Sequence, residues 1–189
     1  MTAGEVYKRL TPALDQAGIP YMLTGSFASA YYGATRSTQG IDFAIAATPA
    51  TLETLTRQLP RDEYYLELNA ALEAHRESSL FNVIDLATGW KIDLIIRKAR
   101  AFSAEEFQRR RQVDLHGVPI FVASAEDVVL SKLEWSKLSE SQRQLEDVVA
   151  ILRSRWDRLD RLYLEKWIAA LQLEAEWKSA IEKAGLANQ

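Results

Sequence analysis

Apolar positions along the chain change their spacing near residue 123. Before that point, short apolar runs bounded by turn residues predict β-strands, and segments with helical spacing separate them. From Ser124 onward the apolar positions recur at helical spacing and the strand signals stop. The pattern therefore predicts an α/β domain over residues 1–123, followed by a helical C-terminal region over residues 124–189.

Strand signals occur in residues 21–24, 41–46, 64–66, 80–86, 90–96 and 113–122. Ala87-Thr88-Gly89 predicts a β-hairpin between the fourth and fifth of these segments, and Gly117 predicts a hairpin within the last. Residues 41–46 are apolar on both faces except at Asp42. This composition is typical of a central strand that is buried on both sides.

Helix signals combine apolar residues at helical spacing with capping residues. Thr48-Pro49 predicts a helix start, and Ser103 with Glu106 forms a predicted capping box. Pro12 is expected to kink the first helix or to delay its start. The predicted helices are residues 6–17, 26–32, 49–59, 69–76, a segment from 103 that carries Arg109 to Arg111, a segment from 124, and residues 140–155, 159–171 and 174–184.

Two acidic residues stand alone in apolar strands. Asp42 and Asp93 each lie between two large apolar residues. A carboxylate in such surroundings is costly unless it is paired, bound to a metal ion, or placed at a strand end that faces a cleft. The two acids therefore predict a functional site. The alternative is a charge cluster of Lys91, Asp93 and Asp42 that only holds two strands together, since Lys91 shares a strand face with Asp93.

A Gly-Ser pair precedes the second predicted helix. Gly25 would let a phosphate group approach the backbone closely, and the first amides of the helix together with the Ser26 hydroxyl would donate hydrogen bonds to it. The alternative is an ordinary turn with a helix cap, which is the commoner use of such a pair. Thirteen residues, from Phe27 to Gln39, separate this pair from Gly40 and Asp42.

This arrangement resembles the signature of the DNA polymerase β-like nucleotidyltransferase superfamily, in which Gly-Ser precedes an Asp-x-Asp strand and a third acid lies on a neighbouring strand. The resemblance implies a mixed sheet flanked by helices. It implies binding of a nucleoside triphosphate and transfer of its nucleoside monophosphate to a hydroxyl acceptor. Asp42 and Asp93 would be catalytic and would hold Mg²⁺ or Mn²⁺, Gly25 and Ser26 would bind phosphate, and Arg36 would reach the substrates.

Gly40 stands where the superfamily pattern has its first acid. Loss of one metal-binding acid commonly removes several kcal/mol of transition-state stabilisation. Two hypotheses follow. Either the protein is an active enzyme in which another oxygen, from Asp85 or Glu63, completes the site, or it is a catalytically degenerate module that binds a nucleotide, an RNA or a protein partner.

The helical region extends the resemblance. Lys132 and the Arg143-x-x-x-Asp147 element resemble the AbiEii-type nucleotidyltransferases, which include toxins of toxin-antitoxin systems. This implies that Lys132 and Arg143 bind the nucleotide, that Asp147 supports catalysis, and that an antitoxin is a partner. The acceptor stays open among RNA such as tRNA, a protein and a small molecule. In the alternative reading, Arg143 pairs with Asp147 one helical turn away, and Lys132 extends to solvent from an apolar face.

Composition narrows the chemistry. The 189-residue chain has no cysteine and two histidines, which leaves metal binding by oxygen ligands. The net charge of −3 argues against a broad electrostatic hold on nucleic acid, although a local basic groove is compatible with it. No apolar run is long enough to span a membrane and no signal peptide is evident, so we expect a cytoplasmic protein.

Overall fold

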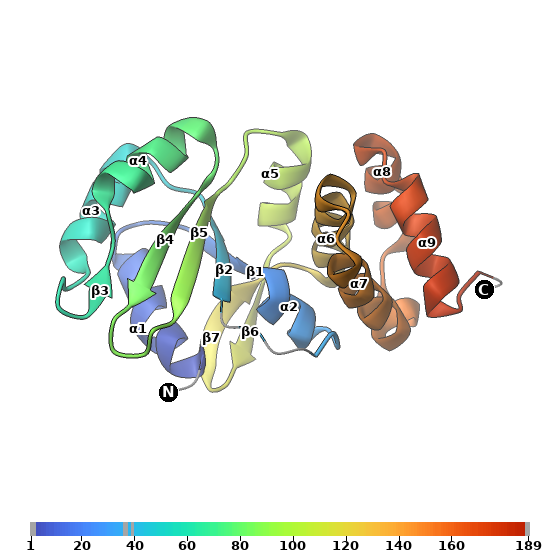
Figure 1. The fold of residues 1–189 in the computed structure, drawn as a ribbon, viewed down its shortest axis with the longest axis horizontal. Coiled ribbons are helices and arrows are strands. Elements are labelled where there is room, and N and C mark those ends of the chain that lie inside the picture. The colour runs from blue at the N-terminus through green and yellow to red at the C-terminus, as the bar shows by residue number, and fades with distance from the viewer. Residues whose placement is uncertain (1–2, 36–37, 39, 188–189) are drawn as a thin grey trace. The chain divides into compact units, whose positions relative to one another are not determined.

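The computed structural model describes residues 3–35, 38 and 40–187, and its contacts divide the chain into two units (Figure 1). The first unit contains Met1–Thr24 and Thr38–Ala123, and the second contains Gly25–Ser37 and Ser124–Gln189. One boundary therefore falls after Ala123, where the apolar spacing changes. The segment Gly25–Ser37, which the sequence pattern assigned to the first domain, groups with the C-terminal helices instead.

The first unit is built on a seven-stranded mixed sheet with strand order β3-β4-β5-β2-β1-β7-β6. The strands are β1 (Tyr21–Thr24), β2 (Gly40–Ile45), β3 (Tyr64–Tyr65), β4 (Leu80–Asp85), β5 (Lys91–Ile96), β6 (Arg111–Leu115) and β7 (Val118–Val122). Strand β2 runs parallel to β5, and β1 runs parallel to β7, whereas the other neighbouring strands are antiparallel. The mixed sheet and both predicted hairpins are confirmed.

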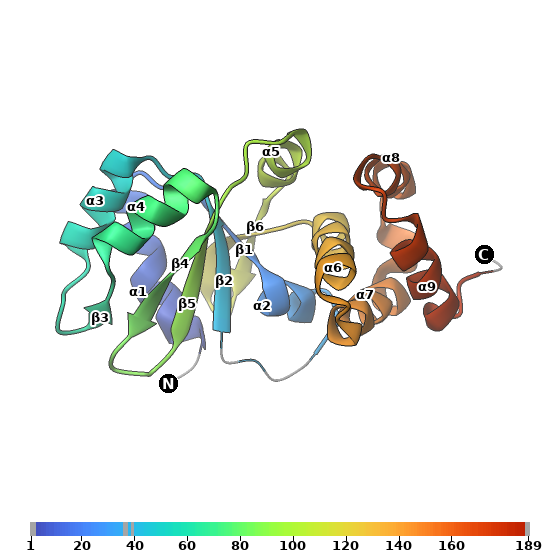
Figure 2. The ribbon, with the colours of Figure 1, turned by 45° about the horizontal axis from the view of Figure 1, so that its top comes forward.

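One face of this sheet forms the core of the first unit. Residues of β2, β4 and β5 alternate between buried and half-buried positions, so each strand buries one face. The ring of Phe43 packs edge-on against Tyr7 of helix α1 and Tyr21 of β1, with ring centroids 6.2 and 5.6 Å apart. Figure 2 shows α1, α3 and α4 grouped beside the strands. The helices of this unit are α1 (Ala3–Gln16), α3 (Pro49–Gln58), α4 (Leu68–Glu77) and α5 (Ala101–Gln108).

The second unit is helical. Its described elements are α2 (Gly25–Tyr31), α6 (Ala125–Ser139), α7 (Gln142–Arg155), a 3-10 turn (Trp156–Arg158), α8 (Arg161–Leu171) and α9 (Glu174–Ala184). The Ser124 side chain caps α6 and that of Asp160 caps α8, each by accepting a backbone amide hydrogen bond. Within the described parts of the chain, no helix is long and apolar enough to cross a membrane.

At two helix starts the structure differs from the sequence prediction: the delay that was one of the two effects expected of Pro12 does not occur, and the capping box at Ser103 was wrong. Helix α1 begins at Ala3 and continues through Pro12, so the proline does not delay its start. The buried apolar face of that helix offsets the missing amide hydrogen bond. Helix α5 is preceded by Arg100 and has no capping side chain, because Ser103 lies inside the helix and its hydroxyl accepts a hydrogen bond from the Arg100 side chain.

Asp85 ties the sheet to helix α1 from the buried face. Its carboxylate is fully buried, accepts the backbone amides of Ala87 and Thr88 at 3.1 Å each, and pairs with the guanidinium of Arg9. We expect Asp85→Asn to lower the free energy of unfolding by about 1–3 kcal/mol, because these hydrogen bonds lose their charged acceptor. Urea unfolding measures the change, with the exposed Asp62→Asn as the control; equal effects of the two would contradict this role.

Candidate functional site

Asp42 and Asp93 lie side by side in the sheet. They are register partners on the parallel strands β2 and β5, and both are half-buried. Neighbouring strands lie about 4.8 Å apart, and side chains at paired positions project from the same face. The fold therefore brings together the two acids that the sequence singled out, although about fifty residues separate them along the chain.

A row of polar residues continues across this face on both sides of the two acids. Thr24 is the register partner of Asp42, and Asn82 is that of Asp93. The Asn82 amide donates a 2.6 Å hydrogen bond to Asp93 Oδ1. Sequence reasoning missed Thr24 and Asn82. Asn82 could have been found by pairing the two strands of the predicted hairpin, because this pairing places it opposite Asp93.

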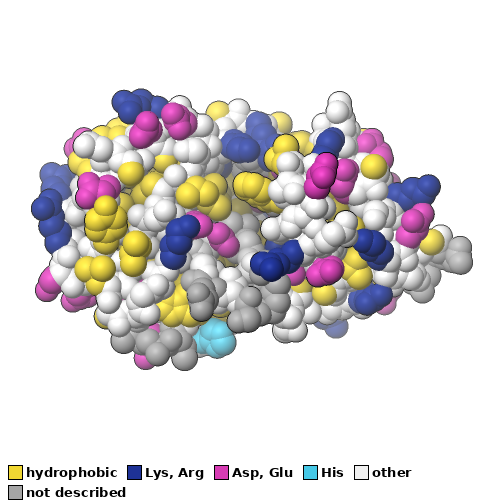
Figure 3. All heavy atoms as spheres, viewed as in Figure 1, with side chains coloured by type: hydrophobic (Ala, Val, Ile, Leu, Met, Phe, Trp, Pro, Cys, Tyr) yellow, Lys and Arg dark blue, Asp and Glu magenta, His cyan; other side chains and the backbone are white. Residues whose placement is uncertain are grey.

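Lys91 adds a positive charge to the row. Its Nζ lies 3.3 Å from Asp93 Oδ1, and its side chain is 55% exposed. Figure 3 shows a basic side chain next to an acidic one over this part of the sheet. Among the described residues, Asp93 Oδ2 has no hydrogen-bond or ion-pair partner. The contact between Lys91 and Asp93 that belongs to the alternative charge cluster is thus present, and one carboxylate oxygen of Asp93 is left for a ligand.

The surroundings of the two acids differ from the sequence prediction. Residues 41–46 were expected to be buried on both faces, but Asp42 and Ala44 lie on a face that is only half-buried. The same holds for Asp93 and Ile95 on β5. The prediction of burial on both faces was wrong because Ala44 and Ile95, which are apolar, lie on the half-buried face. Amino-acid composition alone does not distinguish such a face from a buried one. The site is therefore an accessible row of side chains and does not consist of two deeply buried charges.

At Gly40, the position of the first acid in the pattern that the sequence resembles, there is space for a larger side chain. Gly40 lies on the same strand face as Asp42 and is the register partner of Lys91. A Cβ atom added at Gly40 would meet no atom within 4 Å. The hydroxyl of Thr38 bonds both backbone groups of Gly40, at 3.3 and 3.4 Å. The glycine is therefore not required by packing, and a larger side chain fits.

The donor set fits one magnesium ion. Mg²⁺ usually takes one or two carboxylates and completes its shell with phosphate oxygens and water. Asp42 and Asp93 provide two such carboxylates, and no cluster of three acidic, histidine or cysteine side chains occurs in the part of the chain that the structure describes. Asp85 cannot complete the site because it lies on the opposite face of β4 from Asn82, and Glu63 precedes the edge strand β3.

The Gly-Ser pair begins helix α2 in the second unit. Gly25 follows Thr24 directly in the chain and has a positive φ of 62°, a conformation that favours glycine. Ser26 is 9% exposed, and the Ser29 hydroxyl donates to the Gly25 carbonyl at 2.8 Å. The predicted helix start is confirmed to within one residue. Arg36 lies outside the described residues.

Lys132 and Asp147 form a buried ion pair between α6 and α7. Lys132 Nζ lies 2.7 Å from Asp147 Oδ2 and donates to Gln144 Oε1 at 2.8 Å. Their side chains are 5% and 6% exposed. The alternative readings of these residues were therefore wrong: Lys132 does not extend to solvent, and Asp147 pairs with Lys132 while Arg143 is exposed on α7. Both charges are compensated locally.

A second polar cluster in this unit was not foreseen. The carboxylate of Asp127 accepts hydrogen bonds from the Ser124 hydroxyl at 2.6 Å and the Tyr163 hydroxyl at 2.5 Å, and Asp127 is fully buried. Glu126 accepts the Asp160 amide at 3.0 Å. The sequence indicated only that a helix begins near Ser124. The link to Tyr163 joins α6 to α8 and is visible only in the folded chain.

No protein-family model matches the sequence, and no curated protein does. Solved structures do match. The crystal structure of ANT(2″)-Ia in complex with adenylyl-2″-tobramycin has a TM-score of 0.60 and 14% identity, over 91% of this chain and 98% of that one. The chain has a nucleotidyltransferase fold. The mixed sheet with a helical C-terminal region that the sequence predicts is thereby confirmed.

Two further structures with the nucleotidyltransferase fold cover most of the chain. An antigenic nucleotidyltransferase-like protein from Paracoccidioides brasiliensis has a TM-score of 0.56 and 15% identity, over 95% of this chain and 91% of that one. The lincomycin-bound lincosamide antibiotic adenylyltransferase LnuA has a TM-score of 0.54 and 12% identity, over 80% and 96%. At these identities, the likeness establishes the fold of this chain.

Proposed function

We propose that the protein binds a nucleoside triphosphate and transfers its nucleoside monophosphate to a hydroxyl acceptor. The observation that carries this proposal is the register of Asp42 with Asp93, which places two carboxylates together on an accessible face of a nucleotidyltransferase fold. In the reaction, the acceptor oxygen bonds to the α-phosphorus, the bond from that phosphorus to the bridging oxygen breaks, and pyrophosphate leaves. The hydroxyl proton passes to a carboxylate or to water.

The residues have separate roles in this proposal. Asp42 and Asp93 would hold Mg²⁺ or Mn²⁺, whose charge would offset that of the reacting phosphate. The amides at Gly25 and Ser26 would donate hydrogen bonds to the triphosphate at the start of α2. Asn82 and Lys91 would keep the Asp93 carboxylate in one orientation, since both contact its Oδ1.

Residues of the helical unit have proposed roles as well. A phosphate contact by Lys132 would require its ammonium to leave Asp147 and Gln144, whereas the exposed Arg143 needs no such exchange. We therefore propose that Arg143 and Arg36 contact the substrates directly. Lys132 and Asp147 would support the site by holding α6 against α7.

The proposal allows three classes of acceptor, a small molecule, an RNA and a protein, and each can be tested. One structural neighbour is in complex with adenylyl-2″-tobramycin and another is lincomycin-bound, which supports a small-molecule acceptor. The resemblance to AbiEii-type toxins supports an RNA, such as tRNA, or a protein acceptor, with an antitoxin as partner. Transfer of an α-phosphate label to one of these acceptors, with a γ-phosphate label released, is the expected result. If no acceptor gains the α label with Mg²⁺ or Mn²⁺ present, the transfer proposal fails.

A second candidate function is nucleotide binding without transfer. Gly40 and the ion pair between Lys91 and Asp93 favour it, because the site lacks one acid and contains a cation close to a second acid. A less negative site attracts a divalent ion less strongly. Calorimetry that detects nucleotide binding, together with absence of label transfer, would support this candidate over the first.

Restoring the missing acid separates the two candidates. We expect Gly40→Asp to tighten Mn²⁺ binding by about tenfold, because a third carboxylate enters open space on the same face as Asp42. Mn²⁺ titration followed by electron paramagnetic resonance measures the change. Gly40→Asn is the matched control, since it adds a side chain of the same size without charge.

The label-transfer assay is then repeated on the same variant. A rise in transfer with Gly40→Asp indicates that the natural chain is weakened by the glycine. Equal Mn²⁺ affinities of the Asp and Asn variants would contradict the assignment of position 40 to the metal site.

A further inference from the structure

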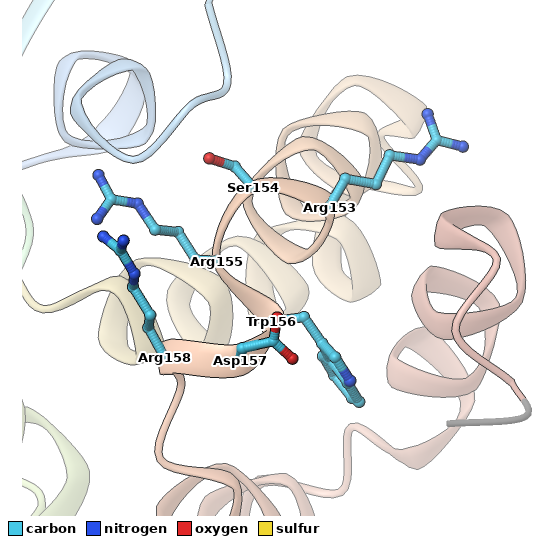
Figure 4. Close-up of a pocket in the computed structure, with 6 residues that line it drawn as sticks. All are labelled: Arg153, Ser154, Arg155, Trp156, Asp157 and Arg158. Carbon is cyan, nitrogen blue, oxygen red and sulfur yellow. The ribbon is translucent and has the colours of Figure 1, made fainter.

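A hollow in the helical unit is lined by consecutive residues at the end of α7. Its volume is about 430 Å³, and its lining consists of Arg153, Ser154, Arg155, Trp156, Asp157 and Arg158 (Figure 4). Three of these six residues are arginines. The proposed nucleotidyl transfer uses none of them, so the hollow needs an explanation of its own.

The three arginines differ in what they contact. Arg153 donates to the carbonyls of Lys183 and Ala184 at 2.7 and 3.5 Å, which attaches α7 to the end of α9. Figure 4 shows Arg155 and Arg158 extending to the other side, in the same direction as each other. Neither of these two forms an ion pair among the residues that the structure describes. Arg153 is thus structural, whereas Arg155 and Arg158 keep their charge for a ligand.

Packing holds this part of the hollow in place. The Arg155 guanidinium carbon lies over the ring of Tyr32, 5.6 Å from its centre, so a cation–π contact restrains this side chain. Trp156 stacks on Trp177 with centroids 6.3 Å apart, and the Arg161 guanidinium lies over its ring at 5.0 Å. A side chain held in this way loses less freedom when a ligand binds.

Ser154 adds a hydroxyl to the same wall. A Cβ atom at Gly33 would approach the Ser154 side chain to 2.8 Å, so the glycine lets the loop after α2 come close to α7. Gly33 also has a φ of 112°, which side chains rarely adopt. The sequence pattern assigned no functional role to Gly33. Its structural effect is to bring the segment with Tyr32 against the base of the hollow.

We propose that Arg155 and Arg158, with the Ser154 hydroxyl, bind a phosphate group of a ligand. Two guanidinium groups present several N–H donors in planar forks that match phosphate oxygens. The hollow lies beyond the C-terminal end of α2, roughly 10 Å along this seven-residue helix from Gly25 and Ser26. It is therefore a site separate from the proposed triphosphate site. The phosphate belongs either to a small phosphorylated molecule or to a nucleic-acid backbone.

Stabilisation of the α7 dipole is the competing explanation. Basic side chains near a helix C-terminus interact favourably with its carbonyls. This accounts for Arg153 and Arg155 in the last turn of α7, but Arg158 lies beyond the helix in the 3-10 turn. Asp157 also lines the hollow, yet Figure 4 shows its carboxylate on the side of Trp156, away from the two guanidinium groups. The dipole explanation therefore does not cover the pair.

Side-chain NMR of the full chain tests the proposal with inorganic pyrophosphate and with a short single-stranded RNA. We expect both probes to shift the Nε–H signals of Arg155 and Arg158 and the indole signal of Trp156. Arg155→Gln with Arg158→Gln should weaken this binding about tenfold. Arg158→Gln alone leaves the contact with Tyr32 intact and should weaken it about threefold, which guards against a folding defect in the double variant.

The control variant for the Arg155 and Arg158 double variant removes two arginine charges from another part of the chain. Arg57→Gln with Arg61→Gln changes two exposed arginines and should leave both titrations unchanged. RNA binding that is much tighter than pyrophosphate binding identifies a nucleic-acid backbone as the ligand, whereas similar affinities identify a small phosphorylated molecule. The proposal is overturned if the three signals do not move with either probe, or if the control variant weakens binding as much as the double variant.

Discussion

Asp42→Asn is expected to reduce label transfer roughly a thousandfold, which corresponds to about 4 kcal/mol of transition-state stabilisation. Asparagine keeps the size of the side chain and its place beside Asp93 but removes one of two negative charges in the row. A site with only two carboxylates has little reserve, since no third acid from the described residues joins the pair. Steady-state transfer of the α-phosphate label measures the loss.

Two further measurements make this expectation specific. Asp42→Asn should also weaken Mn²⁺ binding, whereas Asp62→Asn, which removes an exposed acid of the same unit, should change neither quantity. Urea unfolding checks that the folded state is intact, because Asp42 lies on the half-buried face. Transfer by Asp42→Asn at the rate of the unmodified protein would eliminate the acid row as the reacting site.

Lys132→Met is expected to lower the free energy of unfolding by about 3–5 kcal/mol. The substitution leaves the Asp147 carboxylate buried without its ammonium partner at 2.7 Å, and Gln144 loses its donor. Burying an uncompensated charge is costly because the interior solvates it poorly. Urea unfolding monitored by far-ultraviolet circular dichroism measures the change.

A double variant distinguishes this structural role from a direct role in binding. Lys132→Met with Asp147→Leu removes both charges and should recover most of the lost stability, since an apolar pair can replace a buried ion pair. Lys178→Met is the control, because Lys178 is exposed and its contact with Glu182 measures 4.0 Å; it should change stability by less than about 0.5 kcal/mol. Losses that simply add in the double variant would contradict the ion-pair explanation.

Much of the secondary structure could be predicted because local signals decide it. The strand at residues 21–24 and the helix at residues 174–184 coincide with β1 and α9. Thr48 caps α3 as its sequence context indicates. The capping box at Ser103 was wrong, because α5 begins two residues earlier, at Ala101, and the Ser103 hydroxyl accepts a hydrogen bond from the Arg100 side chain.

The site was predicted in part. Asp42 and Asp93 were identified as isolated acids, and the structure makes them register partners. The partners that modify them, Asn82 and Thr24, were missed because their roles depend on strand pairing between distant segments. Lys132 and Asp147 were singled out, but their ion pair was not predicted, because it depends on how α6 packs against α7.

The sequence by itself indicated an α/β domain followed by a helical region, and it has Gly40 where the pattern that it resembles has its first acid. Only the tertiary structure decided that Asp42 and Asp93 face an accessible side of the sheet, that Lys91 pairs with Asp93, and that residues 25–37 group with the C-terminal helices. The spacing of apolar residues predicts which segments form helices and strands, because it reflects the backbone geometry and the burial of a single segment. The side chains that meet across strands and helices are set by register and packing, which no single segment contains.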